Sequence, residues 1–336
     1  MSARDSSVVT LRDVAERAGV SVSTVSRALD ERMPTSKSAS AARIREIAQQ
    51  IGYRRNVFAS SLRRGETAML GVVVPRLTDA VMALMFEAIE RASRKRGHYA
   101  VVATSGDAPD DERQAVERLL DRNVDGLILA NARIDDSLPA MLRTQKVRHS
   151  LVLRTDGASP SSLGDDFQGG YFAVRHLLDL GHRNIAVVTG PDFTSSANDR
   201  AAGARAAATE AGVELPSDRV IFAGYGIDSG IESGKRLLET ATPPTAIFAA
   251  NDNLAIGIST VAAHAGKTLG RDLSIVGYND IPLAEKLPVP LTTVRVPFDQ
   301  VAEAGVELLF DEDDGNTIRR ATPVLIPRKS TAPPMR

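Results

Sequence analysis

The stretch TLRDVAERAGVSVSTVSRALD, residues 10–30, decides the fold of the N-terminal part of the chain. Thr10, with Asp13 three positions later, is close to a capping box, and apolar residues follow at helical spacing. Gly19 suits the left-handed conformation that ends many helices. Ser21 is a good N-cap for a second helix over 22–29. Two short helices joined by a glycine-containing turn are typical of a helix-turn-helix.

The second of these helices has the outer face expected of a DNA-reading helix. A third helix is predicted to run from the end of the polar loop 30–38 to about Ile51. The three helices together form a small core, and its role would be to present the second helix to a partner. The outward side chains of Val22 and Ser23 are small, which suits insertion into the major groove. Arg27 has the fork geometry that binds guanine O6 and N7, although a plain surface arginine is an equal alternative.

A short segment after the third helix predicts a further contact with DNA. Asn56 is a good N-cap, 57–64 has room for two turns, and Gly65 suits the residue after a helix. A helix this short is marginal in water and would order only against a partner. Leu62 is then a candidate wedge for the minor groove, with Arg63 beside phosphates. The alternative is an interdomain linker in which Leu62 packs on the rest of the protein.

Charge and composition bound the kind of protein. The chain has 336 residues, no Cys and a net charge of −1, yet residues 1–65 carry +6 and the rest −7. A basic head on an acidic body suggests that the head meets an anion. The missing Cys excludes disulfides, thiolate metal sites and a Cys nucleophile. There is neither an apolar run long enough to span a bilayer nor a signal-like N-terminus, so no membrane partner and a cytoplasmic location are expected.

From Met69 onward, apolar strands alternate with amphipathic helices. The strands are expected in two groups, at 69–74, 99–104, 125–130 and 150–154, and at 184–190, 219–224, 245–250 and 273–278, with 291–296 and 322–327 completing them. Strands that alternate with helices indicate parallel sheets covered on both faces. The predicted fold class is therefore a small all-α helix-turn-helix head with an α/β body of two parallel-sheet subdomains.

The carboxyl ends of these strands predict a ligand pocket, because ligands of open α/β sheets bind beyond those ends. The residues there are polar: Thr78, Asp79, Asn131, Asp165, Asp166, Arg200, Tyr225, Asn251, Asp252, Asn279 and Asp280. Such a set suits a small polyol or similar metabolite held by side-chain hydrogen bonds. Taken singly, each residue is more simply a helix cap or a turn residue.

Several ordered motifs, beginning with residues 10–30, resemble the lac-repressor (LacI/GalR) family of bacterial transcription regulators. Beyond GYRRNVFASSLRRG at 52–65, the likeness continues through VDGLILA (124–130), HLLDLGHRNIAVVTGP (176–191), FAANDNLAIG (248–257), LSIVGYNDIPLA (273–284) and LTTVRVP (291–297). The resemblance covers about residues 10–328. It implies a DNA-binding head and a body similar to periplasmic sugar-binding proteins, with a small-molecule effector between the subdomains and two chains in a homodimer on an operator.

The resemblance also implies roles for single residues. It places Val22, Ser23 and Arg27 at base-reading positions and makes 56–64 a hinge helix whose Leu62 works as a pair. The residues expected to contact DNA are Thr10, Val22, Ser23, Thr24, Ser26, Arg27, Asn56, Ala59, Leu62 and Arg63. The residues expected at the effector are Asp79, Asn131, Asp165, Asp166, Gln168, Arg200, Tyr225, Asn251 and Asn279, with Tyr225 stacking on it.

The sequence departs from the family pattern in the hinge, the pocket and the tail. Arg55 stands where the family usually has proline, and Asn279 where it often has aspartate. Residues 79–82, Asp-Ala-Val-Met, replace a segment like Asn-Pro-Phe-Phe, which removes stacking surface and weakens the case for a sugar effector. The tail shows no heptads, so no tetramerising coiled coil is expected.

The resemblance and the strand pattern give the following domain boundaries. The helix-turn-helix domain is expected over 8–55, the hinge helix over 56–65, the effector-binding and dimerisation domain over 68–328, and a tail over 329–336. Within the body, the N-subdomain is assigned 68–158 with 292–320, and the C-subdomain 159–290 with 321–328.

Two other function classes fit the α/β body alone. A solute-binding protein would not need the head. An α/β enzyme is disfavoured because the chain lacks G-x-G-x-x-G, G-x-x-x-x-G-K-[ST] and G-x-S-x-G motifs, and its five His residues show no metal-ligand spacing. We therefore expect no catalytic residue, metal site or cofactor.

Overall fold

The chain divides into two compact units, residues 1–67 and 68–336. The structure is a computed structural model and describes residues 9–29, 38–53, 67–135, 137–311 and 317–335. Within the head, the hinge candidates Asn56, Ala59, Leu62 and Arg63 lie outside the described residues. Each unit is described by itself below.

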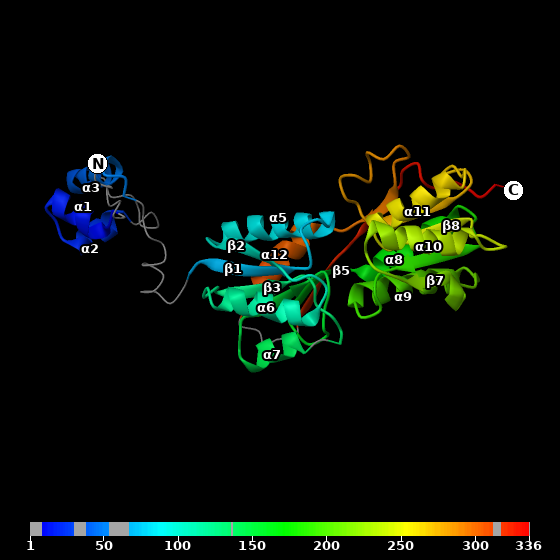
Figure 1. Cartoon of the computed structure of the whole chain (residues 1–336), viewed down its shortest axis with the longest axis horizontal. Helices are drawn as coiled ribbons and strands as arrows, with labels where there is room; N and C mark the ends of the chain where they lie inside the picture. Colours follow the sequence, from blue (N-terminus) through cyan, green and yellow to red (C-terminus); the bar gives the residue numbers. More distant parts are fainter. Residues whose placement is uncertain (1–8, 30–37, 54–66, 136, 312–316, 336) are drawn as a thin grey trace, which may run out of the picture. The chain divides into compact units, whose positions relative to one another are not determined.

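The head contains the predicted helix-turn-helix. Its helices are α1 (Leu11–Ala18), α2 (Val22–Ala28) and α3 (Ala39–Gln50), drawn in blue in Figure 1. At the start of α1 the backbone N–H of Thr10 donates to the carboxylate of Asp13 at 2.6 Å, which confirms the capping interaction. The core of the head lies between the three helices, on Val14, Val25 and Ile44.

The first half of the body is a six-stranded parallel sheet in the order β11-β5-β4-β3-β1-β2. Its strands are β1 (Met69–Val74), β2 (Tyr99–Thr104), β3 (Gly126–Leu129), β4 (His149–Val152), β5 (Ser161–Gly164) and β11 (Ile318–Ala321). Its helices are α5 (Ala80–Lys95), α6 (Pro109–Leu120), α7 (Leu138–Thr144) and α12 (Phe298–Leu308). Figure 1 shows α5 and α12 on one face of the sheet and α6 on the other. We call this half the first subdomain.

The second half is another six-stranded sheet, in the order β12-β10-β9-β8-β6-β7. Its strands are β6 (Ile185–Thr189), β7 (Val220–Phe222), β8 (Ala246–Ala249), β9 (Ser274–Asn279), β10 (Thr292–Arg295) and β12 (Val324–Ile326). Its helices are α8 (Asp166–Asp179), α9 (Ser195–Glu210), the 3-10 turn η1 (Ser217–Arg219), α10 (Ile227–Leu238) and α11 (Asp252–His264). Only β12 among these described strands runs antiparallel to its neighbour, β10. We call this half the second subdomain.

Fully buried strands explain why the two sheets were predictable. The residues of β3, β6 and β8 are buried along their whole length, and such strands read as continuous apolar runs rather than as alternating patterns. The predicted fold class, an all-α head and an α/β body of two parallel-sheet subdomains, is confirmed.

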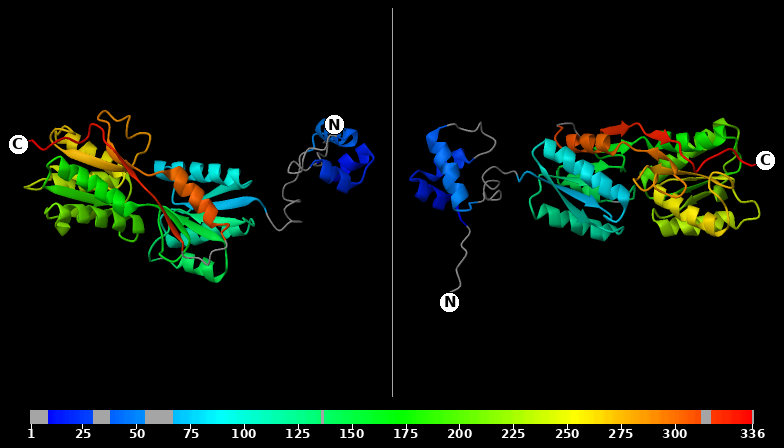
Figure 2. Two further views of the ribbon diagram at one scale, coloured as in Figure 1. Left: turned by 180° about the vertical axis from the view of Figure 1, so that it is seen from behind. Right: turned by 90° about the horizontal axis from the view of Figure 1, so that it is seen from above.

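The subdomain boundaries require correction at two strands. Residues 161–164, assigned to the C-subdomain, form β5 of the first sheet between β4 and β11. Residues 292–295, assigned to the N-subdomain, form β10 of the second sheet beside β9. The sequence of β5, Ser-Ser-Leu-Gly, has no apolar run that would predict a strand. It forms a strand because its backbone pairs with β4 and β11. The chain consequently passes between the two sheets three times, and Figure 2 shows its C-terminal segments running from one to the other.

The predicted tail also differs from the structure. The side chain of Ser330 is fully buried, and its hydroxyl accepts from the N–H of Thr292 at 2.8 Å. The backbone N–H of Ala332 donates to the hydroxyl of Ser274 at 3.1 Å. Residues 329–332 therefore belong to the second subdomain, because these bonds satisfy polar groups along buried strands.

Glycines bring α8 and α9 into direct backbone contact. A Cβ atom on Gly203 of α9 would lie 1.9 Å from the carbonyl oxygen of Phe167, and one on Gly170 of α8 would lie 2.1 Å from that of Arg200. No side chain fits in either place. This contact matters for the site below, because it sets the position of Arg200.

Gly203→Ala is expected to destabilise the protein by about 1–3 kcal/mol, because the two helices must separate to admit the methyl group. In an unconstrained helix the same change would stabilise by up to about 1 kcal/mol, so the sign itself is diagnostic. The measurement is urea unfolding of both proteins. Gly226→Ala is the control, since a Cβ there meets nothing within 4 Å. A Gly203→Ala protein as stable as the wild type would contradict the close contact.

Candidate functional site

The first candidate surface is the outer face of α2. Val22, Ser23 and Arg27 are exposed along it, and Val22 is 40% exposed although it is apolar. Arg27 forms no ion pair with any other residue that the structure describes in the head. This face therefore presents one cation among small side chains.

The remaining head candidates have structural bonds of their own. The hydroxyl of Thr24 lies 2.8 Å from that of Ser21, whose oxygen also accepts from the backbone N–H of Thr24 and so caps α2. Thr10 caps α1, and Ser26 is half-buried. Of the candidates on α2, Val22, Ser23 and Arg27 are the most exposed.

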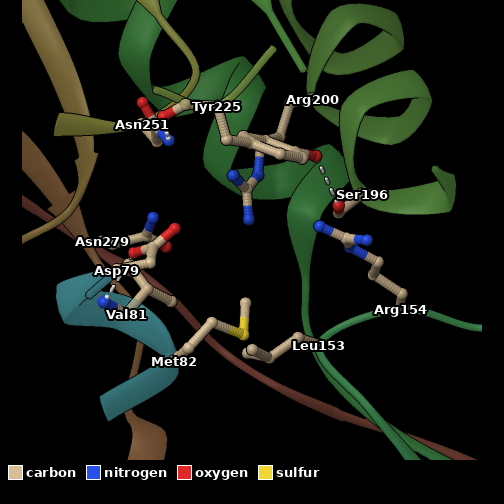
Figure 3. Close-up of a pocket in the computed structure, with 10 residues that line it drawn as sticks. All are labelled: Asp79, Val81, Met82, Leu153, Arg154, Ser196, Arg200, Tyr225, Asn251 and Asn279. Carbon is tan, nitrogen blue, oxygen red and sulfur yellow. Dashed lines mark hydrogen bonds between the residues drawn. The ribbon is translucent and has the colours of Figure 1, made fainter. Parts of the chain in front are cut away.

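The second candidate site is a pocket between the two subdomains of the body. It holds about 380 Å³ of empty space, part of it open to solvent. Five of its residues come from the first subdomain and five from the second: Asp79, Val81, Met82, Leu153 and Arg154, and Ser196, Arg200, Tyr225, Asn251 and Asn279 (Figure 3). A ligand here would touch both halves of the body.

Arg200 is held in this pocket by a buried ion pair. Its Nε lies 2.8 Å from the carboxylate of Asp166, which also accepts from the hydroxyl of Tyr278 at 3.1 Å. Its Nη1 donates to the carbonyl of Ala250 at 2.6 Å, and its guanidinium lies 3.8 Å from the centre of the Tyr278 ring. Burial lowers the pKa of Arg200, but the charge of and hydrogen bond to Asp166, together with the neighbouring Tyr278 and Tyr225, outweigh burial. The net pKa is raised, so Arg200 stays charged.

Tyr225, Ser196 and Asn251 form the roof of the pocket in Figure 3. The hydroxyl of Tyr225 lies 3.1 Å from that of Ser196. The amide of Asn251 donates to the carbonyl of Tyr225 at 2.9 Å, and its oxygen accepts from Leu254 N–H at 2.7 Å, capping α11. Asn251 therefore uses both ends of its amide within the protein and acts first as a support for the Tyr225 ring.

Asp79 and Asn279 line the other side of the pocket. The carboxylate of Asp79 caps α5 by accepting from Val81 N–H at 2.9 Å, and burial raises its pKa. Asn279 ends β9 with φ at +97°, in the left-handed region that asparagine tolerates better than most side chains. Its buried amide has no hydrogen-bond partner among the described residues, so it is available to a ligand.

The other predicted effector residues lie apart from this pocket. Asn131 lines a neighbouring cavity together with Arg133, Arg154 and Phe193. Asp165 caps α8 by accepting from the N–H of Gln168 at 3.0 Å, and neither residue lines the pocket between the subdomains. Asp166 lies behind Arg200 and holds it.

Five lining residues were missed by reasoning from the sequence. They are the apolar Val81, Met82 and Leu153 and the polar Arg154 and Ser196. Arg154 was read as the last residue of a strand, but β4 ends at Val152, so Arg154 lies beyond the carboxyl end of the strand. The position of Arg154 just after a strand was the signal from which the sequence could have predicted it as a lining residue.

The head and the body match two family models. Residues 10–56 match the model described as bacterial regulatory proteins, lacI family, and residues 174–331 match the periplasmic binding protein-like domain. The HTH-type transcriptional regulator DegA of Bacillus subtilis is 31% identical over 336 residues, covering 96% of this chain and 98% of its own. The chain belongs to the lacI family of bacterial regulatory proteins.

Other lacI-family proteins agree with this assignment. The ribose operon repressor of Escherichia coli is 28% identical over 331 residues and is covered over its full length. The lac repressor dimer solved with operator and the anti-inducer ONPF has a TM-score of 0.86 at 26% identity, covering 97% of this chain and 100% of that one. The chain is thus a DNA-binding transcriptional regulator of the lacI family.

The described residues form neither a membrane span nor a metal-binding cluster. Within the described ranges, no helix combines the length and the apolar character needed to cross a membrane. In the same part of the chain, no three His, Cys, Asp or Glu side chains are grouped as metal ligands would be.

Proposed function

We propose that this lacI-family regulator is a repressor that binds a palindromic DNA operator as a homodimer in the cytoplasm. A small polar effector, a sugar or related metabolite, binds between the subdomains and controls operator affinity. The observation that supports this proposal is the pocket built half from each subdomain and lined by charged, amide and aromatic groups. The same residues fit binding without catalysis. Apart from Tyr225, the lining residue with a hydroxyl group is Ser196, and no other lining residue is placed beside it as a base.

The DNA contacts are proposed for the exposed face of α2 and for the hinge. Arg27 would bind a guanine edge, Val22 a thymine methyl group, and Ser23 either base type. Thr10, Thr24 and Ser26 would assist at the backbone, where most protein–DNA hydrogen bonds are made. In the hinge, we propose contacts from Asn56, Ala59, Leu62 and Arg63, with the Leu62 pair wedged into the minor groove.

Control by the effector would act through the angle between the subdomains. Asp79, Arg200, Tyr225, Asn251 and Asn279 are the proposed contacts that were predicted from the sequence, and a ligand bridging them would favour one relative position of the two halves. That position changes the spacing of the two hinges in a dimer. A coupling free energy of about 1–3 kcal/mol, or roughly 5–150-fold in operator affinity, is enough for regulation.

The experiment that tests this function is selection of binding sites from random duplex DNA by the full-length protein at two salt concentrations. We expect enrichment of one palindrome, with affinity falling as salt rises because phosphate contacts release counterions. The selection is repeated with a pool of metabolites, in case the effector acts as a corepressor. No enriched sequence in any of these selections would contradict the proposal.

Arg27→Ala is expected to weaken binding to the selected operator by about 1–3 kcal/mol and to relax the base preference at one position of each half-site. The reason is the loss of a bidentate contact to a base edge. The measurement is a gel-shift titration against the operator and against versions substituted at each position. Arg43→Ala is the control, because Arg43 is an exposed arginine on α3, outside α2. A uniform loss on all sequences would assign Arg27 to phosphate contact instead.

A further inference from the structure

Arg154 is a buried cation without an ion pair among the described residues. It lies two residues beyond β4 and is only 9% exposed. It forms no hydrogen bond to a described residue either, and its guanidinium carbon lies 5.1 Å from the centre of the Tyr225 ring, a cation–π contact. It lines both the pocket between the subdomains and the cavity that contains Asn131.

The carboxylates that line a cavity with Arg154 are those of Asp79, Asp107 and Glu112, and none of them forms an ion pair with it. Asp107 pairs with Arg76. Asp79 caps α5, and Asp166 pairs with Arg200. Asp156, two residues further along the chain, lies 2.6 Å from Arg143. A guanidinium taken out of water is costly unless an anion compensates it. Burial raises the pKa of Asp79 and the charge of Arg154 opposes this rise, but no carboxylate of the described residues forms an ion pair with Arg154, so its guanidinium lacks a directly bonded counter-charge.

A second guanidinium faces the same space. Arg200 uses Nε and Nη1 on Asp166 and Ala250, and Figure 3 shows the free end of its guanidinium directed into the pocket that Arg154 also lines. Planar guanidinium groups match the oxygens of carboxylates and phosphates and bind them with two parallel hydrogen bonds. The pocket thus offers an anion site at one end.

The rest of the pocket has a different character. Asp79 and Asn279 offer an acceptor and a free amide, which suit hydroxyl groups. Val81, Met82 and Leu153 supply an apolar surface beside them, and the Tyr225 ring lies opposite (Figure 3). A ligand that fits all of these contacts has hydroxyl groups on a compact skeleton and an anionic group at one end.

We propose that the effector of this regulator is a hydroxylated small molecule with a carboxylate or phosphate group, and that Arg154 binds this group and discriminates against neutral sugars. This inference rests on the proposed function, since it names the chemistry of the same effector. The proposed effector differs from a neutral sugar, because a neutral sugar would leave the charge of Arg154 without a counter-ion in the pocket.

Calorimetric titration of the full-length protein tests the proposal with matched probes. Sulfate is the minimal anion, and D-glucose, D-gluconate, D-glucuronate and D-glucose 6-phosphate vary the group on one skeleton, as do D-ribose and D-ribose 5-phosphate. All titrations are made in chloride at constant ionic strength. We expect sulfate and at least one acid or phosphate to bind, each at least tenfold more tightly than the neutral sugar. The acid and phosphate arms then separate the two anionic groups.

Two variants assign the effect to Arg154. Arg154→Gln keeps a polar, shorter side chain and removes the charge, and it is expected to weaken anion binding at least tenfold, with Arg154→Lys intermediate. Arg118→Gln is the matched control, because Arg118 is an exposed arginine on α6 that bonds only to Gln114 among the described side chains. Anion binding that is equal in wild type and Arg154→Gln would overturn the proposal. So would the absence of any anion preference in the wild type.

The same probes distinguish this inference from the proposed function. A gel shift on the selected operator is repeated with each ligand. A neutral sugar that alone changes operator affinity would leave the regulator function in place and overturn the anionic effector. Anion binding that depends on Arg154, in a protein that selects no operator, would support the site and contradict the repressor function.

Discussion

Arg200→Ala is expected to lower the free energy of unfolding by about 3–5 kcal/mol, the cost of removing one partner from a buried ion pair. Asp166 is fully buried and would be left with the Tyr278 hydroxyl and no cation. The carbonyl of Ala250 would also lose its donor. The measurement is urea unfolding at pH 8, followed through the whole transition.

The pH dependence of this loss identifies its cause. Burial raises the pKa of Asp166, and the charge of Arg200 opposes that rise. In Arg200→Ala the pKa of Asp166 therefore lies well above its unfolded value, so the penalty is absent at low pH and grows as pH rises. The deficit of the variant should be smaller at pH 5 than at pH 8. A deficit independent of pH would mean that lost packing, and not a buried charge, is responsible.

Two further variants serve as controls for Arg200→Ala. Arg175→Ala removes a guanidinium from α8 whose pairs with Asp179 and Glu210 lie in solvent, and its stability should match the wild type. The double variant Asp166→Ala, Arg200→Ala should lose less than the sum of the two single losses, because the pair acts as a unit.

The local signals in the sequence predicted the elements that depend on local chemistry. The capping pair at the start of α1 depends on Thr10 and Asp13, which are three residues apart. The strands β3 and β8 are buried along their whole length, and their sequences show this as apolar runs. The element β5 gave no such signal, since Ser161 and Ser162 are ordered by pairing with β4 and β11. Its placement depends on strands up to 157 positions further along the chain, which no local pattern encodes.

The candidate site divides in the same way. Positions that follow strands, such as Asp79 and Asn279, were found because the topology of parallel sheets places strand ends together. Asp166 was proposed at the effector, but the close contact of α8 with α9 places it behind Arg200. Arg154 was not predicted as a site residue, because the sequence does not show that its guanidinium lacks an ion pair among the described residues. Only the three-dimensional surroundings of the side chain show this.

Replacing Asp252 with asparagine is expected to stabilise the protein at pH 8 and not at pH 4. Asp252 is the first residue of α11, is 1% exposed, and accepts from the Thr293 hydroxyl at 2.6 Å and the Ile281 N–H at 2.8 Å. Burial raises the pKa of its carboxyl from 3.8 to about 7. Asparagine can keep both contacts, because its oxygen accepts from Ile281 and its amide donates to the Thr293 oxygen.

The sign follows from the order of the two pKa values of Asp252. Below 3.8 the carboxyl is protonated in both the folded and the unfolded state, so it contributes no pH dependence. Between 3.8 and about 7 only the unfolded state ionises, and the free energy of unfolding falls as pH rises. Above 7 the loss is complete and amounts to about 4 kcal/mol at 1.36 kcal/mol per pKa unit. Because other groups titrate as well, the quantity to measure is the difference between wild type and Asp252→Asn.

Urea unfolding of both proteins from pH 4 to pH 8 measures this difference. The advantage of Asp252→Asn should grow through that range and level off above pH 7. Asp272→Asn should not show that growth, because the hydrogen bond to Arg271 lowers the pKa of Asp272 instead of raising it. A constant difference would show that Asp252 stays ionised throughout.

The protonation of Asp252 also bears on the pocket, because Asp252 joins α11 to β10 and to Ile281, the residue after Asp280. An ionised, buried carboxyl at pH 8 would weaken the support of Asn251 and Asn279, which line the pocket. The effector affinity of the wild type should therefore fall over the same pH range and stay level in Asp252→Asn.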